Sequence, residues 1–139
     1  MKILNEKIEL KTKGNGDLIN ITDRVSDLVA SSDVKKGQVT VFVAGSTAAI
    51  TTFEYEPGLI RDVKELCDKL IPRKTHYHHD DTWGDANGFS HLRAALFGPS
   101  LVVPINDKKA VLGTWQQVVL AEFDNRPRNR EVVIQIIGE

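Results

Sequence analysis

The chain has 139 residues, of which 41% are hydrophobic and 27% are charged, and this composition predicts one soluble globular domain over residues 1–139. The net charge of -1 argues against a broad surface for nucleic acid, and no apolar run approaches the ~20 residues that cross a membrane. The single cysteine, Cys67, excludes an intramolecular disulfide and favours a cytoplasmic setting.

The first elements are predicted from apolar spacing and turn residues. Alternation of apolar and charged residues over 8–12 predicts a half-buried strand, and the turn residues 14–17 predict a hairpin that returns through 18–21. Thr22 can cap a helix with an apolar stripe at Val25, Leu28 and Val29. The β-branched run 39–44 indicates a central strand.

The middle of the chain alternates extended and helical patterns. Residues 45–48 break the central strand, 49–56 are extended, and Pro57-Gly58 predicts a turn. Helical spacing over 59–70 places Cys67 on the apolar face, which favours a packed core cysteine over a nucleophile. Pro72 stops this helix.

The segment 73–90 is polar and without clear periodicity, and loops of this length inside a domain are usually functional or disordered. Tyr77 and Trp83 are expected to pack it down. Ser90 can cap a short helix through Phe97, with Gly98 as its stop. The strand patterns 101–105, 110–112, 114–123 and 131–137 follow at short intervals, which predicts mainly antiparallel pairing and an α+β class.

All four histidines lie between His76 and His91. Imidazole is the commonest metal ligand and the usual acid or base near neutral pH. His76, His78 and His79 stand beside Asp80, Asp81 and Asp85, a mixture typical of metal sites. The alternative is a solvated loop that happens to be rich in histidine.

Other polar residues are candidates for ligand contacts, each with a structural alternative. Ser46 and Thr47 can bind an anion through hydroxyls and backbone amides, or form a strand bulge. Glu54 and Glu56 share one side of a strand and can act as metal ligands or a base, or stay solvated. The arginines at 126, 128 and 130 can hold a phosphate or form a surface charge run. Gly113, Thr114 and Gln116 can make polar contacts beside Trp115, an expected packing anchor.

Several of these motifs together resemble the YjbQ family. They are the segment 77–80, Asn87-Gly88-Phe89-Ser90-His91-Leu92-Arg93-Ala94, the segment 96–100, Gly113-Thr114-Trp115-Gln116, the segment 124–128, and Gly45-Ser46-Thr47-Ala48 with Glu54. The resemblance covers nearly the whole chain. His79 matches the histidine of the family pattern, whereas His76 and His78 are additions.

The resemblance implies a mostly antiparallel, bifurcated sheet that forms a partly open barrel with outer helices, and a homotrimer. It also implies weak activity as a secondary thiamine-phosphate synthase, a transferase that joins a pyrimidine diphosphate to a thiazole phosphate and releases pyrophosphate. Such a site needs anion donors and would take a divalent metal, zinc or magnesium, to neutralise the leaving group.

We therefore expect one pocket with catalytic and metal-binding roles for Glu54, His79 and His91. The expected substrate-binding residues are Ser46, Thr47, Asn87, Ser90, Arg93, Gly113, Thr114, Gln116 and Arg126. His91 falls in the first turn of a helix, where free backbone N–H groups favour an anion. An alternative holds the anion on the imidazoles without a metal.

Three functions compete at this point. The first is an enzyme acting on a phosphorylated small molecule. The second is a non-catalytic trimer that binds a metal or a phosphorylated metabolite in the same pocket. The third is a structural trimer whose polar residues serve subunit contacts.

Overall fold

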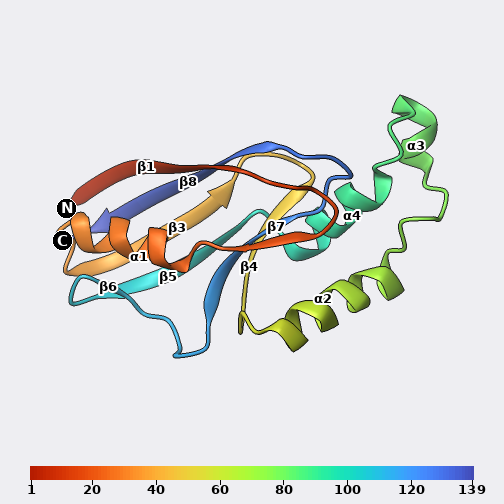
Figure 1. The fold of residues 1–139 in the computed structure, drawn as a ribbon. Coiled ribbons are helices and arrows are strands. Elements are labelled where there is room, and N and C mark those ends of the chain that lie inside the picture. The colour runs from red at the N-terminus through yellow and green to blue at the C-terminus, as the bar shows by residue number, and fades with distance from the viewer.

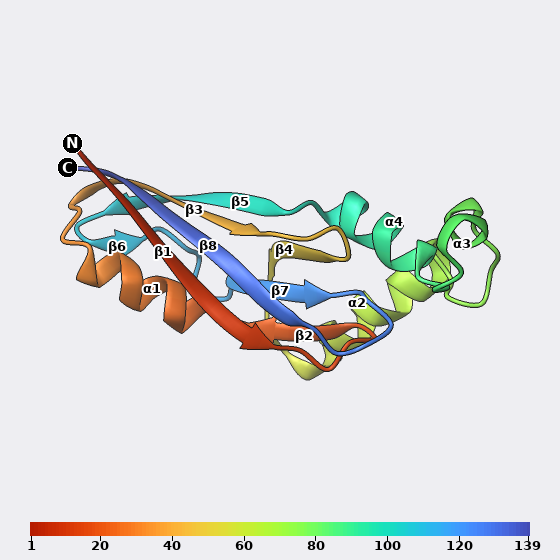
Figure 2. The same ribbon diagram turned by 90° about the horizontal axis from the view of Figure 1, so that it is seen from above.

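The computed structural model describes residues 1–139 as antiparallel sheet curled into a half-barrel, with helices outside it (Figures 1 and 2). The predicted α+β class is confirmed. The elements in chain order are β1 (Lys2–Lys11), β2 (Asp17–Asn20), α1 (Thr22–Ser31), β3 (Lys36–Val43), β4 (Ala48–Phe53), α2 (Pro57–Leu70), α3 (His78–Trp83), α4 (Gly88–Phe97), β5 (Ser100–Asn106), β6 (Lys109–Ala110), β7 (Gln117–Glu122) and β8 (Asn129–Gly138).

The strands form two sheets, with orders β1-β8-β3-β5-β6 and β2-β7-β4, and every pair is antiparallel. β1 pairs with β8 along its whole length, from Lys2 opposite Gly138 to Lys11 opposite Asn129. The two ends of the chain therefore lie side by side (Figure 1). β3 lies in the middle of the larger sheet, as its β-branched run predicts.

The predicted hairpin of β1 with β2 is wrong. Gly14, Asn15 and Gly16 do form a turn with positive φ, but β1 pairs with β8 and β2 pairs with β7 in the other sheet. The turn itself binds the end of β7, because the backbone N–H of Gly16 donates to the Glu122 carbonyl at 2.9 Å. Long-range pairing therefore overrides a local hairpin signal.

The small sheet is the middle layer of the fold. In β7, Val118 and Leu120 belong to the core shared with the large sheet, whereas Val119 and Ala121 belong to a second core with α2 and α4. Alternate side chains of a strand point to opposite faces, so one strand supplies both cores. Glu122 lies on the same face of β7 as Val118 and Leu120, so its side chain points between the two sheets.

The helices cover the sheets and extend beyond them. Cys67 on α2 is buried in the second core, as its helical spacing predicts. Pro57 and Gly58 do not form the predicted turn but begin α2, where the Glu56 carboxylate accepts from the Gly58 and Leu59 N–H groups. α3 and the start of α4 lie past the end of the sheets, far from the two termini (Figure 2). None of the helices has the length and apolarity needed to cross a membrane.

Candidate functional site

Two histidines from consecutive helices face each other at the end of the molecule where α3 lies. The ring centroids of His79 on α3 and His91 on α4 are 4.3 Å apart, with an angle of 41° between the ring planes. Both rings line a hollow of about 370 Å³, which we call the histidine pocket. Its complete lining is Gly45, Ser46, Thr47, His79, Trp83, Asp85, Asn87, His91, Arg128 and Arg130.

Asp80 on α3 binds the start of α4 and so helps to hold the His79 ring near the His91 ring. Its carboxylate accepts from the backbone N–H of Gly88 at 3.0 Å and from that of Tyr77 at 3.2 Å. Close packing of the two helices also needs glycine at position 88, because a Cβ there would lie 2.8 Å from the Tyr77 Cβ. The segment predicted as a polar loop therefore contains the helix α3, which is held against the start of α4.

The connection from β3 to β4 forms the opposite wall. Gly45 has φ of +145°, a conformation that side chains disfavour, and a Cβ there would lie 2.7 Å from an Arg130 guanidinium nitrogen. This glycine lets the chain pass directly over Arg130. The Thr47 hydroxyl then donates to the Asp124 carboxylate at 3.0 Å and accepts from Arg130 at 2.6 Å.

A buried ionic network supports this wall. Arg130 donates through Nε and Nη2 to the two carboxylate oxygens of Glu122, both at 2.6 Å. Glu122 also accepts from the Thr12 hydroxyl at 2.8 Å and from the Asp124 N–H at 3.0 Å. Glu122 has no exposed surface and Arg130 only 8%. The pair is therefore neutralised internally.

Arg128 and Arg130 both line the pocket, but Arg128 is the more exposed of the two. It binds the fully buried Asp124 carboxylate through Nε at 2.8 Å and Nη2 at 2.7 Å, yet a third of its side chain stays exposed. A guanidinium has five N–H donors, so this ion pair leaves donors for a ligand. Among the pocket residues, Asp85 is the sole carboxylate beside two arginines and two histidines. The free N–H donors of Arg128 are therefore the feature of this pocket that suits an anion.

Burial lowers the pKa of His91, and the neighbouring His79 lowers it further, while Asp124 and Asp85 act in the opposite direction. The His91 ring is therefore neutral near pH 7 and can accept a proton. Burial alone would raise the pKa of Asp124, but hydrogen bonds from Arg128, the Asn125 N–H and Thr47 outweigh it and hold this pKa below its ordinary value. Asp124 is a fixed negative charge, not a proton donor.

Three buried side-chain atoms lack a hydrogen-bond partner, namely His79 Nδ1, Asn87 Oδ1 and Ser90 Oγ. His79 lies in α3, Asn87 is the N-cap of α4, and Ser90 lies in the first turn of α4. The Asn87 amide N–H₂ group donates to Asp124 at 3.5 Å, which turns its oxygen away from that carboxylate. A buried polar atom without a partner lowers the stability of the fold, so such atoms are rare and often mark functional sites.

Five of the predicted site residues meet in this pocket: His79, His91, Ser46, Thr47 and Asn87. Glu54 does not. It lines a separate hollow with Thr114 and Trp115, beyond the opposite end of β4. Gln116 binds Thr52 and the Gly113 N–H in that same region. β4 lies between Thr47 and Glu54 and places them at opposite ends of the sheet, although they are close together in the sequence.

Three other residues predicted to contact a ligand do not line the histidine pocket. Arg93 is buried, donates to the Ile71 carbonyl at 2.7 Å and stacks on Phe89. Ser90 is fully buried, and Asn87, not Ser90, occupies the N-cap position of α4. Arg126 is exposed in the turn that approaches Gly14 and does not line the pocket.

The predicted set of Glu54, His79 and His91 around a metal is not assembled. No three histidine, cysteine or carboxylate side chains in the chain converge as ligands for a metal ion. The predicted anion at the start of α4 is also corrected, because the Asp80 carboxylate already accepts from the Gly88 N–H. A protein carboxylate thus takes the place expected for a ligand.

Trp83 and Trp115 were both expected to pack against the protein, and both are exposed instead. Trp83 is 74% exposed at the rim of the histidine pocket and Trp115 is 70% exposed in the loop before β7. Sequence reasoning also missed Glu122 and Asp124 as parts of the site. Their signal is a pair of carboxylates directly after the apolar run 118–121, followed by arginines two residues apart.

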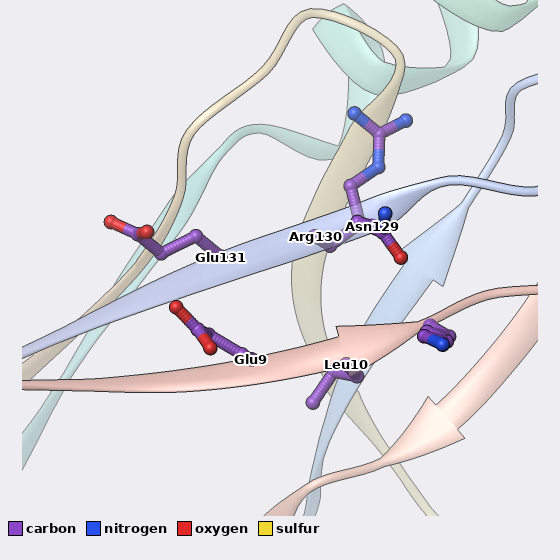
Figure 3. Close-up of a pocket in the computed structure, with 6 residues that line it drawn as sticks. Glu9, Leu10, Asn129, Arg130 and Glu131 are labelled. Atoms are coloured by element: carbon purple, nitrogen blue, oxygen red, sulfur yellow. The ribbon is translucent and has the colours of Figure 1, made fainter.

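A larger hollow, of about 450 Å³, lies over the paired ends of β1 and β8 and shares Arg130 with the histidine pocket. Figure 3 shows the Arg130 guanidinium pointing away from β1, whereas Glu9 and Glu131 lie together farther along the two strands. Lys7 binds both of these carboxylates, Glu9 at 3.2 Å and Glu131 at 3.6 Å. This hollow is a groove on a solvated strand pair, and the histidine pocket is the better candidate site.

A family model described as "UPF0047 protein YjbQ-like" matches residues 6–139. A UPF0047 protein of Archaeoglobus fulgidus is 40% identical over 131 residues, which are 94% of this chain and 99% of the relative. One from Methanothermobacter thermautotrophicus is 36% identical over 139 residues, covering 100% and 95% of the two chains.

Solved structures with the same fold are also similar to this chain over nearly its whole length. A YbjQ-like protein of unknown function from Sulfolobus solfataricus superposes with a TM-score of 0.94 at 33% identity and 99% coverage of both chains. A hypothetical protein from Aeropyrum pernix gives a TM-score of 0.91 at 28% identity, with 98% of this chain and 99% of the other covered.

Proposed function

The chain belongs to the YjbQ family, and we propose that it is a small-molecule enzyme that acts on a phosphorylated substrate in the histidine pocket. The observation that supports this most directly is the pair of imidazoles, 4.3 Å apart, beside the part-exposed Arg128. Arginine offers paired N–H donors that match phosphate oxygens. Neutral His91 supplies a proton acceptor within the same hollow.

The proposed roles follow from charge. Arg128 binds the phosphoryl oxygens, while Arg130 stays committed to Glu122 and keeps the wall in place. An arriving phosphate favours the protonated form of His91, because an opposite charge favours the charged form. Protonated His91 can then pass its proton to a departing phosphate or pyrophosphate oxygen, as general acids do.

The reaction that we propose to test first is the joining of a pyrimidine diphosphate to a thiazole phosphate. The thiazole nitrogen forms a bond to the pyrimidine methylene carbon, the bond from that carbon to the diphosphate oxygen breaks, and pyrophosphate leaves. Charge grows on the leaving oxygen, and preorganised donors aimed at developing charge are a major source of catalysis. Arg128 and an imidazolium are suited to that role.

The test combines calorimetry with inorganic pyrophosphate and a thiamine-phosphate assay on the two precursors. His91→Gln and Arg128→Gln are expected to weaken pyrophosphate binding at least tenfold, while Glu54→Gln, in the other hollow, is expected to leave it unchanged. Circular dichroism establishes that the variants are folded. Pyrophosphate binding that is absent, or insensitive to both pocket variants, would overturn the proposal.

Binding without turnover would leave the non-catalytic alternative, a phosphometabolite-binding protein. A metal is tested in the same experiment, by repeating the titration after chelation. Two imidazoles without a third ligand favour the anion alone. We therefore expect unchanged affinity after chelation, and a large loss would restore the metal to the site.

We further propose a homotrimer in a cytoplasmic setting. Large apolar side chains are exposed on α2 and α4, at Leu66, Leu70, Leu92 and Leu96, and exposed apolar area of this kind often marks an interface. Light scattering at micromolar concentration checks the assembly. A single monomeric species would remove the trimer.

A further inference from the structure

The side-chain oxygen of Asn87 is a buried acceptor without a donor. Asn87 lines the histidine pocket and is only 4% exposed, and its Oδ1 atom receives no hydrogen bond. Of the three unpaired buried atoms, the Ser90 hydroxyl can donate or accept and the role of His79 Nδ1 depends on its tautomer, whereas a carboxamide oxygen can only accept. Asn87 therefore fixes the chemistry of its missing partner, which must carry a hydrogen.

Surrounding groups fix the orientation of this amide. The Asp124 carboxylate is ionised and can only accept, so the Asn87 N–H₂ group, 3.5 Å away, must face it and the oxygen must face away. The main chain is held too, because the Asn87 carbonyl accepts from the N–H groups of Ser90 at 2.9 Å and His91 at 3.3 Å. Asn87 and His91 are four residues apart, so they share the side of α4 that lines the pocket.

The pocket therefore offers one ligand both donors and an acceptor. Arg128 keeps N–H donors free beside its bond to Asp124, while no protein donor reaches Asn87 Oδ1. An oxyanion without a proton presents acceptors alone, which would set its lone pairs against the amide oxygen and leave that oxygen unpaired. An oxyanion that keeps one proton satisfies both sides. Inorganic phosphate keeps at least one proton near neutral pH, whereas sulfate has none.

We propose that Asn87 makes the histidine pocket selective for a protonated oxyanion, so that the pocket takes hydrogen phosphate, or a phosphoryl group that retains a proton, and rejects sulfate. Asn87 Oδ1 accepts from the P–OH group, while Arg128 donates to the ionised oxygens. Hydrogen phosphate and sulfate share a tetrahedral shape and a double negative charge, so only the hydrogen separates them. The selectivity rests on the proposed function, because it needs an oxyanion at Arg128, but phosphate binding alone does not require it.

Calorimetry compares inorganic phosphate with sulfate at about pH 8, well above the second pKa of a phosphoryl group, where phosphate is mainly HPO₄²⁻. The natural protein is expected to bind phosphate at least about tenfold tighter, because sulfate leaves a buried acceptor unpaired. Asn87→Leu removes the acceptor at similar size, and α4 has no cap hydrogen bond from this side chain to lose. The variant is expected to lose the preference for phosphate without weaker sulfate binding. Asn5→Leu, at an exposed asparagine on β1 whose oxygen is paired with Gln135, is expected to alter neither affinity.

The side-chain amide signals of Asn87 in an NMR titration locate the contact without any variant. Phosphate is expected to move them further than sulfate does at equal saturation. Equal affinities for the two ions in the natural protein, or a preference that survives in folded Asn87→Leu, would overturn the selectivity, while pyrophosphate binding that depends on Arg128 would keep the proposed site. If phosphate, sulfate and pyrophosphate all fail to bind, both proposals are overturned.

Discussion

Replacing Arg130 with methionine is expected to lower the free energy of unfolding by about 3–5 kcal/mol, the usual loss when one partner of a buried ion pair is removed. Methionine retains most of the apolar stem. The Glu122 carboxylate, however, loses two hydrogen bonds of 2.6 Å and keeps only those from Thr12 and the Asp124 N–H. With no exposed surface, Glu122 cannot turn to water.

A double-mutant cycle separates this pairing from general packing damage. Glu122→Gln alone leaves the Arg130 guanidinium buried without its charge partner and should cost a similar amount, about 3–5 kcal/mol. In the double variant no charge is stranded, and the glutamine oxygen still accepts from Thr12 or Asp124. The combined loss should therefore fall short of the sum of the two single losses by about 2 kcal/mol or more.

Urea unfolding followed by circular dichroism measures all four proteins, since the midpoint and slope give the free energy. Lys7→Met is the control, because Lys7 pairs with Glu9 and Glu131 on the surface, and it should leave the midpoint unchanged. Additive losses, or an Arg130→Met loss below about 1 kcal/mol, would refute the argument that this pair is buried and coupled.

Three further outcomes are expected. Asp80→Ala removes the acceptor that joins α3 to α4 and should cost about 1 kcal/mol, with faster hydrogen exchange at the Gly88 amide; unchanged exchange would show that Asp80 does not hold the two helices together. Cys67→Ala should cost about 1 kcal/mol, and since burial raises the pKa of the Cys67 thiol, the native protein should resist a disulfide reagent that would label a nucleophile rapidly. The pKa of Asp124 is lower in the folded than in the unfolded chain, so its stabilisation is complete above the unfolded pKa and is lost as the pH falls through the folded one. Arg128→Gln raises the folded pKa and should shift acid unfolding, followed by circular dichroism, to higher pH, whereas an unchanged midpoint would argue against this ion pair.

Several features follow from the sequence because they depend on neighbours along the chain. The short helix that ends before Gly98, the apolar face that carries Cys67, and the central position of β3 were all predictable from spacing. A family resemblance read from short motifs likewise indicated the antiparallel half-barrel. The conjunction of His79 and His91 with Ser46, Thr47 and Asn87 was predicted as one pocket, and the structure places these five together.

Other features depend on partners far apart in sequence. The turn 14–17 predicts a hairpin, yet β1 pairs with β8 at ten positions and β2 pairs with β7, whereas the four residues of β2 could pair with only part of β1. Glu54 belongs to the same segment as Thr47, but the length of β4 carries it to the other end of the sheet. The metal set predicted from residue types failed for that reason.

The sequence by itself determined which face of each element is apolar, where α4 stops, and which residues carry the imidazoles and guanidinium groups. Only the tertiary structure decided that Arg130 binds Glu122 while Arg128 keeps donors for the pocket, and that the His91 ring lies against the His79 ring. The physical reason is the distance along the chain over which each property is set. Helical and strand periodicities are set within a few residues, whereas burial, charge pairing and the pKa of His91 are set by segments that meet only when the two sheets and α4 pack together.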